Sequence, residues 1–172
     1  KDIKILFFGR TDCEGSEKLL NQILRDGLDV TYIRSHERGE KLPEDIHEWV
    51  GDYIICFRTL FILPEALIKK AKIAAINFHP GPPEYPGSGC INFALYDEVS
   101  DFGVTAHLMS KKVDNGKILE VRRFPIQKSE NLFSVLERTH NELYSLCSDF
   151  IAALSSQGKS FIKLKLAECA DV

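Results

Sequence analysis

The segment "IAAINFHPGPPEYPGSGCINFALY" (residues 73–96) decides the fold that we predict, because the pattern of the chain changes within it. Its first six residues form an apolar run that is typical of a buried strand. Asn77 and His79 stand at the end of that run. Prolines and glycines then fill residues 80–89 and enforce a stiff turn through which no helix can continue. A buried strand therefore ends in an amide and an imidazole, directly before a rigid turn.

Before this turn, strand-like and helix-like segments alternate along the chain. Apolar runs predict strands at residues 3–8, 28–33, 52–57 and 73–78. We expect Ser16 to cap the first helix, which ends near Gly27, and Pro43 and Pro64 to begin the next two. This alternation is typical of a parallel sheet with helical crossovers. The sequence therefore predicts an α/β fold with a mostly parallel sheet flanked by helices.

After the turn, the pattern predicts a helix in "INFALYDEV" (91–99), two further strands and one long helix. The strands lie at 103–109 and 118–126, and the long helix runs from about 131 to 155 with its apolar positions largely on one face. The segment "SFIKLKL" (160–166) alternates apolar and charged residues, which predicts a short edge or swapped strand at the carboxyl terminus. No linker or repeat divides the chain, so we expect one domain over residues 1–172.

Composition narrows the class of protein. The 172 residues carry 22 Lys and Arg against 25 Asp and Glu, a net charge of −3, which makes nucleic acid an unlikely partner. No apolar run approaches the ~20 residues that cross a bilayer, so we expect no membrane span. Lys1 directly precedes a strand-like segment, and we therefore expect no signal peptide. The five cysteines form no CxxC pair, which favours reduced thiols in the cytoplasm and no zinc site.

Three polar residues are candidates for catalysis. In open α/β sheets, ligands bind beyond the carboxyl ends of the strands. Asn77 and His79 close the fourth strand, and Asp114 lies in the loop after the fifth. An amide and a protonated imidazole can bind the oxyanion of a tetrahedral intermediate, while a carboxylate orients the imidazole. This set suits acyl transfer by direct attack of an amine, although each residue could instead be purely structural.

Two further places could contact a substrate. Gly9, Arg10 and Ser16 lie at the first strand-to-helix turn, where backbone N–H groups and a positive side chain can bind a phosphate. The turn lacks a G-x-G-x-x-G pattern, so a plain helix cap with a solvated arginine is an equal alternative. Thr105 and His107 share one face of the fifth strand and could line the site. A hydrogen-bonded core histidine is an equal alternative for His107.

Two stretches of the chain resemble a known family. "NFHPGPPEYPGSGCINFALY", followed by "FGVTAHLMSKKVDNGKIL", is similar to the folate-dependent formyltransferases. That family includes glycinamide ribonucleotide transformylase, methionyl-tRNA formyltransferase and the sugar-nucleotide N-formyltransferases. Its Asn-x-His, followed by a distant Asp, matches Asn77, His79 and Asp114. The resemblance extends over nearly the whole chain, and its specific motifs lie between Asp52 and Leu119.

The resemblance implies the Rossmann-like formyltransferase fold and 10-formyltetrahydrofolate as the formyl donor, without a metal. Asn77 would polarise the formyl carbonyl, His79 would stabilise the developing oxyanion, and Asp114 would hold His79 and assist proton transfer. Plain core packing remains an equal alternative for Phe57 and Ile62. The residues that the resemblance places around the folate are Phe57, Arg58, Thr59, Leu60, Phe61, Ile62, Met109, Val113 and Asp114.

The resemblance also bears on the acceptor of the formyl group. The transformylase and transfer-RNA branches usually carry a Ser-Leu-Leu-Pro-type sequence after the histidine, whereas this chain has "HPGPPEYPG". That difference favours a small-molecule acceptor, an amino sugar attached to a nucleotide. The alternatives are methionyl-tRNA, glycinamide ribonucleotide, hydrolysis of the formyl-folate, and a folate-binding module without turnover. The chain ends soon after the long helix, where many relatives have a further domain, so the choice between monomer and homodimer is left open.

Overall fold

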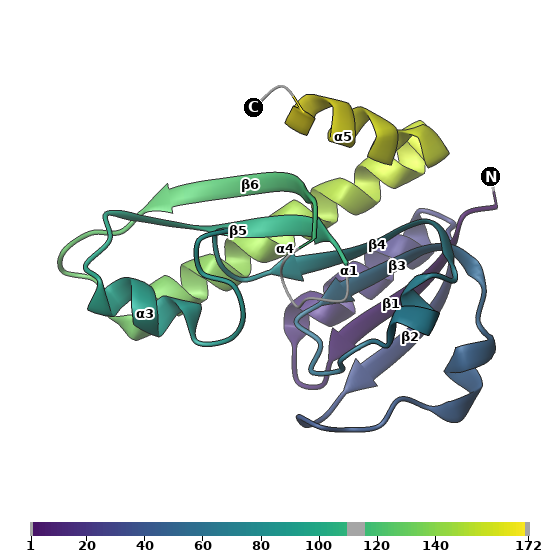
Figure 1. The fold of residues 1–172 in the computed structure, drawn as a ribbon, viewed down its shortest axis with the longest axis horizontal. Helices are drawn as coiled ribbons and strands as arrows, with labels where there is room; N and C mark the ends of the chain where they lie inside the picture. Colours follow the sequence, from purple (N-terminus) through teal and green to yellow (C-terminus); the bar gives the residue numbers. More distant parts are fainter. Residues whose placement is uncertain (1, 110–115, 171–172) are drawn as a thin grey trace.

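The computed structural model describes residues 2–109 and 116–170, which form one α/β unit around a six-stranded sheet (Figure 1). The strand order is β2-β1-β3-β4-β5-β6. The first four strands in this order pair in parallel, whereas β5 pairs antiparallel with both β4 and β6. The prediction of a mostly parallel sheet flanked by helices is therefore confirmed. The strands are β1 (Lys4–Arg10), β2 (Asp29–Ser35), β3 (Gly51–Phe57), β4 (Ala71–His79), β5 (Asp101–Leu108) and β6 (Ile118–Pro125).

Helices cover both faces of the parallel part of the sheet. The long helix α4 crosses most of the molecule in Figure 1. Among the described residues, no helix is long and apolar enough to cross a bilayer. The helices are α1 (Glu14–Arg25), α2 (Glu65–Ile68), α3 (Cys90–Tyr96), α4 (Leu132–Gln157) and α5 (Phe161–Ala170), with single 3₁₀ turns η1 (Glu44–Glu48) and η2 (Gly158–Ser160).

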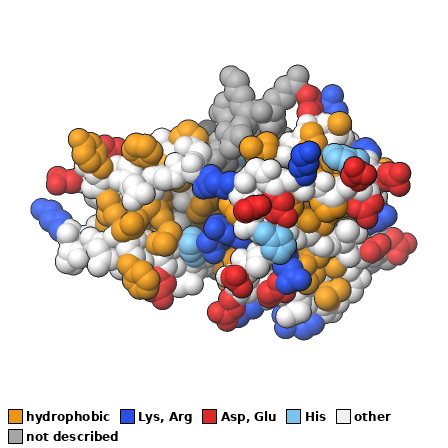
Figure 2. Space-filling view, turned by 90° about the horizontal axis from the view of Figure 1, so that it is seen from below, with side chains coloured by type: hydrophobic (Ala, Val, Ile, Leu, Met, Phe, Trp, Pro, Cys, Tyr) orange, Lys and Arg blue, Asp and Glu red, His pale blue; other side chains and the backbone are white. Residues whose placement is uncertain are grey.

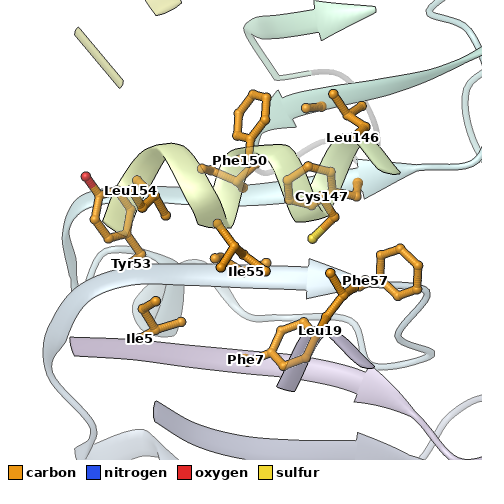
Figure 3. Close-up of a cluster of buried hydrophobic side chains, with 14 of the residues drawn as sticks. Ile5, Phe7, Leu19, Tyr53, Ile55, Phe57, Leu146, Cys147, Phe150 and Leu154 are labelled. Carbon is orange, nitrogen blue, oxygen red and sulfur yellow. The ribbon is translucent and has the colours of Figure 1, made fainter. Parts of the chain in front are cut away.

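The main hydrophobic core lies between the sheet and the helices α1 and α4 (Figure 3). Alternate residues of β1, β3 and β4 point into it, as the period of a strand requires. Phe78 of β4 meets Phe150 of α4 edge to face, with ring centroids 5.4 Å apart. A second, smaller cluster on the other face of the sheet holds η1 and α2 through Ile46 and Leu67.

The β5–β6 pair extends beyond the parallel sheet. β4 pairs with β5 only from Thr105 onward, whereas β6 already pairs with β5 at Asp101. A third cluster of buried side chains packs α3 and the start of α4 against this extension. Its members are Cys90, Ile91, Ala94, Phe102, Phe124 and Val135. The turn after β4 therefore lies beside a two-stranded ribbon rather than beside the main core.

The expectation that Ser16 caps the first helix is wrong. Helix α1 begins two residues before Ser16 and has Cys13 at its N-cap position. Ser16 is fully buried in the first turn, and its Oγ accepts a hydrogen bond from the backbone N–H of Arg10 at 3.2 Å. Ser16 therefore fixes the end of β1 against the helix rather than capping the helix.

The predicted carboxyl-terminal strand at 160–166 is also wrong, because this segment belongs to helix α5. Phe161 and Ile162 are adjacent and both buried, which a strand does not allow on a single face. Phe161 packs on Phe150 of α4 with centroids 5.2 Å apart. Lys165, one turn further, pairs with Glu120 of β6 at 2.8 Å. The lysines that looked like the polar face of a strand thus lie on a helix that packs against α4 and β6.

Candidate functional site

Four polar side chains lie on one face of the sheet where β4 meets β5. Asn77 is paired with His107 and His79 with Thr105 in the antiparallel register. Ile76 and Phe78, which alternate with Asn77 and His79 along β4, point to the opposite face, into the main core. The prediction that Thr105 and His107 share a face with each other is confirmed, and the register places Asn77 and His79 beside them.

The ring of His79 is held by the proline-rich turn that follows it. His79 is 3% exposed, and its Nε2 lies 2.8 Å from the backbone oxygen of Tyr85. A carbonyl oxygen can only accept, so we assign the proton to Nε2. A Cβ atom at Gly81 would lie only 2.8 Å from this Nε2, which requires glycine at that position. The glycine of "HPG" therefore makes room for the imidazole.

Further hydrogen bonds fasten the same turn to β5 and α3. The hydroxyl of Thr105 donates to the backbone oxygen of Gly81 at 2.8 Å. The thiol of Cys90 donates to the backbone oxygen of Gly87 at 3.1 Å and lies 3.8 Å from Nε2 of His79. The turn is thus tied down on both sides, and with it the carbonyl that orients His79.

Asn77 and His107 are joined by a hydrogen bond across the two strands. The Asn77 Nδ2 atom lies 3.3 Å from Nε2 of His107, whose side chain is 4% exposed. His107 is therefore packed behind Asn77, in keeping with its alternative interpretation as a hydrogen-bonded buried histidine.

Basic side chains gather at the neighbouring ends of β1 and β3. Arg10 closes β1, and Arg58 follows β3 with a φ of 54°, a left-handed conformation that is unusual for arginine. Nη1 of Arg58 lies 3.5 Å from Sγ of Cys13, at the start of α1. Burial, then the positive charges of Arg58 and Arg10, lower the pKa of His140 on α4 to about 4. The three side chains thus form a basic group beside the first strand-to-helix turn.

The loop after β3 is anchored to the first two strands by Ser35. The Ser35 hydroxyl donates to the backbone oxygen of Gly9 at 3.1 Å and accepts from the backbone N–H of Leu60 at 2.9 Å. The backbone N–H of Thr11 in turn donates to the backbone oxygen of Ser35 at 2.9 Å. One buried serine therefore fixes the relative positions of the three strand ends.

The structure distributes the predicted folate-contacting residues over several environments. The Phe57 ring is buried in the main core, on the face opposite to Asn77. Phe61 belongs to the second cluster, where Met109 packs with its Sδ 3.7 Å from Sγ of Cys56. Ile62 is 81% exposed, while the backbone N–H of Phe61 donates to the Thr59 hydroxyl at 3.3 Å. The predicted contacts Val113 and Asp114 lie outside the described residues.

Sequence reasoning missed two groups that complete the site. The Tyr85 carbonyl orients His79, but a backbone acceptor has no signature in the sequence. His140 lies on α4, beyond both motifs in the sequence, and only the packing of α4 on α1 reveals its position. A Cβ atom at Gly15 of α1 would touch the Tyr144 ring, one turn beyond His140, at 3.6 Å. Within the described residues, no three His, Cys, Asp or Glu side chains converge in a way that could hold a metal ion.

The mostly parallel sheet, with an amide and an imidazole at the end of β4, can be compared with known proteins. A family model described as formyl transferase matches residues 10–151. The chain belongs to this formyltransferase family. On the face shown in Figure 2, hydrophobic side chains gather toward the side where α3 lies in Figure 1, while charged side chains of both signs and histidines occupy the middle and the other side.

Relatives named for different formyltransferase activities share sequence similarity with this chain. A methionyl-tRNA formyltransferase of Listeria welshimeri is 35% identical over 96 residues, which cover 53% of this chain and 31% of the relative. A phosphoribosylglycinamide formyltransferase of Dictyostelium discoideum is 29% identical over 130 residues, which cover 69% of this chain and 63% of the relative. The chain thus matches 31% of the length of the first of these curated relatives and 63% of the length of the second.

Solved structures show the same fold. An N-formyltransferase from Helicobacter canadensis, in complex with folinic acid and dTDP-3-aminofucose, has a TM-score of 0.73 at 16% identity. The match covers 91% of this chain and 65% of that chain. This likeness confirms the formyltransferase fold.

Proposed function

We propose that this protein transfers a formyl group from 10-formyltetrahydrofolate to the amine of a nucleotide-linked amino sugar. The observation that carries the proposal is the pair Asn77 and His79 on one face of β4, with the His79 ring fixed by Tyr85. Membership of the formyltransferase family supports the formyl group as the cargo.

The residues on β4 divide the work of acyl transfer. The folate supplies a formyl carbon bonded to nitrogen, and its carbonyl oxygen gains negative charge as an amine attacks. The Asn77 amide donates to that oxygen. Nε2 of His79 carries the proton given to Tyr85, so Nδ1 is the atom at which the ring gains or loses a proton. His79 protonated at Nδ1 stabilises the negative charge.

Asp114 keeps the role that the resemblance implies, which is to hold His79 and to take the proton that the amine loses. That proton is then delivered to the departing folate nitrogen, as the new carbon–nitrogen bond forms and the old one breaks.

The apolar side chains on the Asn77 face suit the flat ring of a folate. The backbone N–H of Met109 donates to the backbone oxygen of Ala75 at 2.8 Å. Ala75 lies on β4 two residues before Asn77, and Met109 packs in the same cluster of side chains as Ala75. Phe61 and Leu63 are buried in the same cluster. Apolar walls with a few fixed backbone groups are typical of small-molecule sites. We therefore assign the pterin side of the folate to Met109 and the loop at residues 58–63.

The basic group at the ends of β1 and β3 suits the phosphates of the acceptor. Arg10 and Arg58 supply two positive charges beside Gly9, and His140 adds a third when it is protonated. Ser16 is turned inward onto the Arg10 backbone, so its contribution is to hold the turn. The Helicobacter canadensis enzyme, with its nucleotide sugar, supports an acceptor of this class.

The four cysteines whose side chains the structure describes are free thiols, which suits a reducing compartment, and we place the reaction in the cytoplasm. The oligomeric state is left open.

The decisive assay incubates purified protein with 10-formyltetrahydrofolate and a panel of nucleotide-linked 3-amino and 4-amino sugars. We expect a formamide product with at least one sugar, detected by mass spectrometry. Each alternative has its own outcome in the same assay. Transfer to glycinamide ribonucleotide or to methionyl-tRNA alone would move the protein to another branch, as the relatives allow. Release of formate without an acceptor indicates hydrolysis, and folate binding without any product indicates a binding module.

A further inference from the structure

The His107 ring is held at both of its nitrogen atoms. Nδ1 lies 3.0 Å from the backbone oxygen of Leu108, and Nε2 lies 3.3 Å from Nδ2 of Asn77. The β5–β6 ladder shifts its register between Ala106 and His107. Irregularities of this kind bend a strand and re-aim a side chain, and they are common beside active sites.

The two contacts determine the protonation of the ring. The Leu108 oxygen can only accept, so Nδ1 carries the proton. In the neutral ring, Nε2 is then an acceptor with a lone pair. The Asn77 group facing it at 3.3 Å must therefore be the NH₂ end of the amide. Each assignment follows from the one before, starting at a backbone carbonyl.

This chain of hydrogen bonds fixes which end of the Asn77 amide lies toward β5. An asparagine amide carries donors at one end and an acceptor at the other, and rotation by half a turn exchanges them. With a donor-only neighbour in place of Nε2, the Asn77 oxygen would turn toward β5 and its nitrogen away. In the observed orientation one N–H of the Asn77 NH₂ group donates to Nε2 and the other can donate to a carbonyl substrate. After the flip, that carbonyl would meet the amide oxygen, an acceptor, in place of the NH₂ group.

The Leu108 carbonyl is itself held in place by its surroundings. The Leu108 N–H donates to the Lys117 oxygen at 2.8 Å. A Cβ atom at Gly116 would overlap the Leu108 oxygen and would also lie 3.5 Å from Nδ1 of His107. The glycine of "VDNGK" therefore leaves room for the carbonyl that sets the His107 tautomer.

We propose that His107 is a positioning residue for formyl transfer, which holds the Asn77 amide with its NH₂ group in the orientation that serves the formyl carbonyl. This role rests on the proposed function. It replaces the earlier expectation that His107 contacts the substrate itself.

The test uses two variants that each keep one of the two contacts. His107→Gln places an amide near the position of Nε2 and can still accept from Asn77. His107→Asn places an amide near Nδ1 and can still donate to Leu108. We expect His107→Asn to lower kcat by about 10- to 100-fold, with KM for both substrates nearly unchanged, and His107→Gln to lose no more than about tenfold. Equal losses in the two variants would overturn the proposal.

A double-mutant cycle separates action through Asn77 from a general effect on the fold. We expect the double variant His107→Asn with Asn77→Ala to be no slower than Asn77→Ala alone, because residues that act as one unit are not additive. Multiplying losses would show that His107 acts by another route and would overturn the proposal.

A measurement without substrates keeps the positioning role distinct from the proposed function. Long-range ¹⁵N correlation spectra of the ligand-free protein should show His107 protonated at Nδ1, and the Asn77 NH₂ resonances should shift in His107→Asn but stay closer to wild type in His107→Gln. Protonation at Nε2 alone, or unmoved Asn77 resonances, would overturn the proposal. Absence of transfer by the wild-type protein overturns the proposed function, whereas these spectra still decide whether His107 holds Asn77.

Discussion

Strand β4 presents two unlike sets of side chains. Ile76 and Phe78 lie in the main core and contact helices, whereas Asn77 and His79 lie on the other face and bind β5 and the proline-rich turn. Both sets share one backbone, which is hydrogen-bonded to β3 and β5. The packed face of the strand therefore fixes the position of the polar face, so that alternate residues of β4 contribute to stability and to chemistry.

The largest effect is expected on the core face. Phe78→Ala removes a buried ring that contacts Phe150, and we expect the free energy of unfolding to fall by about 3–5 kcal/mol. Denaturant titration measures this loss. The rate per folded molecule should change little, and Phe78→Leu provides a milder variant if the alanine form does not fold. A stable Phe78→Leu protein that had lost its activity would contradict the division of β4 into a face for stability and a face for chemistry.

On the polar face, His79→Ala should lower the rate of formyl transfer by about 100-fold or more while leaving folate binding nearly unchanged. Steady-state kinetics and equilibrium folate binding measure the two quantities. His47→Ala is a matched control, because His47 is exposed on η1, apart from β4. An unchanged rate in His79→Ala would remove His79 from the mechanism.

A smaller effect is expected on the pH dependence of stability, through His140. The pKa of His140 is about 4 in the folded protein and near 6.5 when unfolded, so the unfolded state binds the extra proton between these values. His140 therefore lowers stability as pH falls from 6.5 to 4 and contributes no pH dependence above that window. After discounting for its partial exposure, we expect a loss on the order of 1 kcal/mol.

Denaturation of the wild type and of His140→Gln across this pH range measures the difference. Equal pH profiles for the two proteins would contradict the expected pKa. Pyrophosphate bound between Arg10 and Arg58 should raise the pKa of His140, which an NMR titration of its ring can follow.

The smallest effect lies within the core face itself. The Tyr53 ring is fully buried, and its hydroxyl has no hydrogen-bond partner among the residues that the structure describes. Burial together with the nearby Asp52 raises the pKa of Tyr53 to about 12. Tyr53→Phe removes a desolvated polar group, so we expect unchanged stability or a gain of up to about 1 kcal/mol. Thermal unfolding of the two proteins measures it. A clear loss would mean that the hydroxyl has a partner such as water.

The sequence predicted local features well and long-range ones poorly. The apolar runs located all six strands, and the pattern is strongest for β1 and β3, which lie inside the parallel part of the sheet and are buried on both faces. The carboxyl-terminal helix was mistaken for a strand, since "SFIKLKL" fits both periods and only the contact of Phe161 with Phe150 selects the helix.

The candidate site divides in the same way. Asn77 and His79 were found because they interrupt an apolar run at a strand end. The roles of Tyr85, Gly81 and His140 depend on backbone carbonyls and on helix packing, which pattern reasoning does not reach.

The third cluster of buried side chains has a consequence for motion. It is small, and it joins α3 to the β5–β6 ribbon separately from the two clusters that hold the parallel sheet. Units of this kind open locally at a lower free energy than the whole protein. We therefore expect amide hydrogens at residues 85–99 to exchange faster than those of β1 and β3. The turn that orients His79 could then swing aside to admit a substrate while the sheet beneath it stays folded.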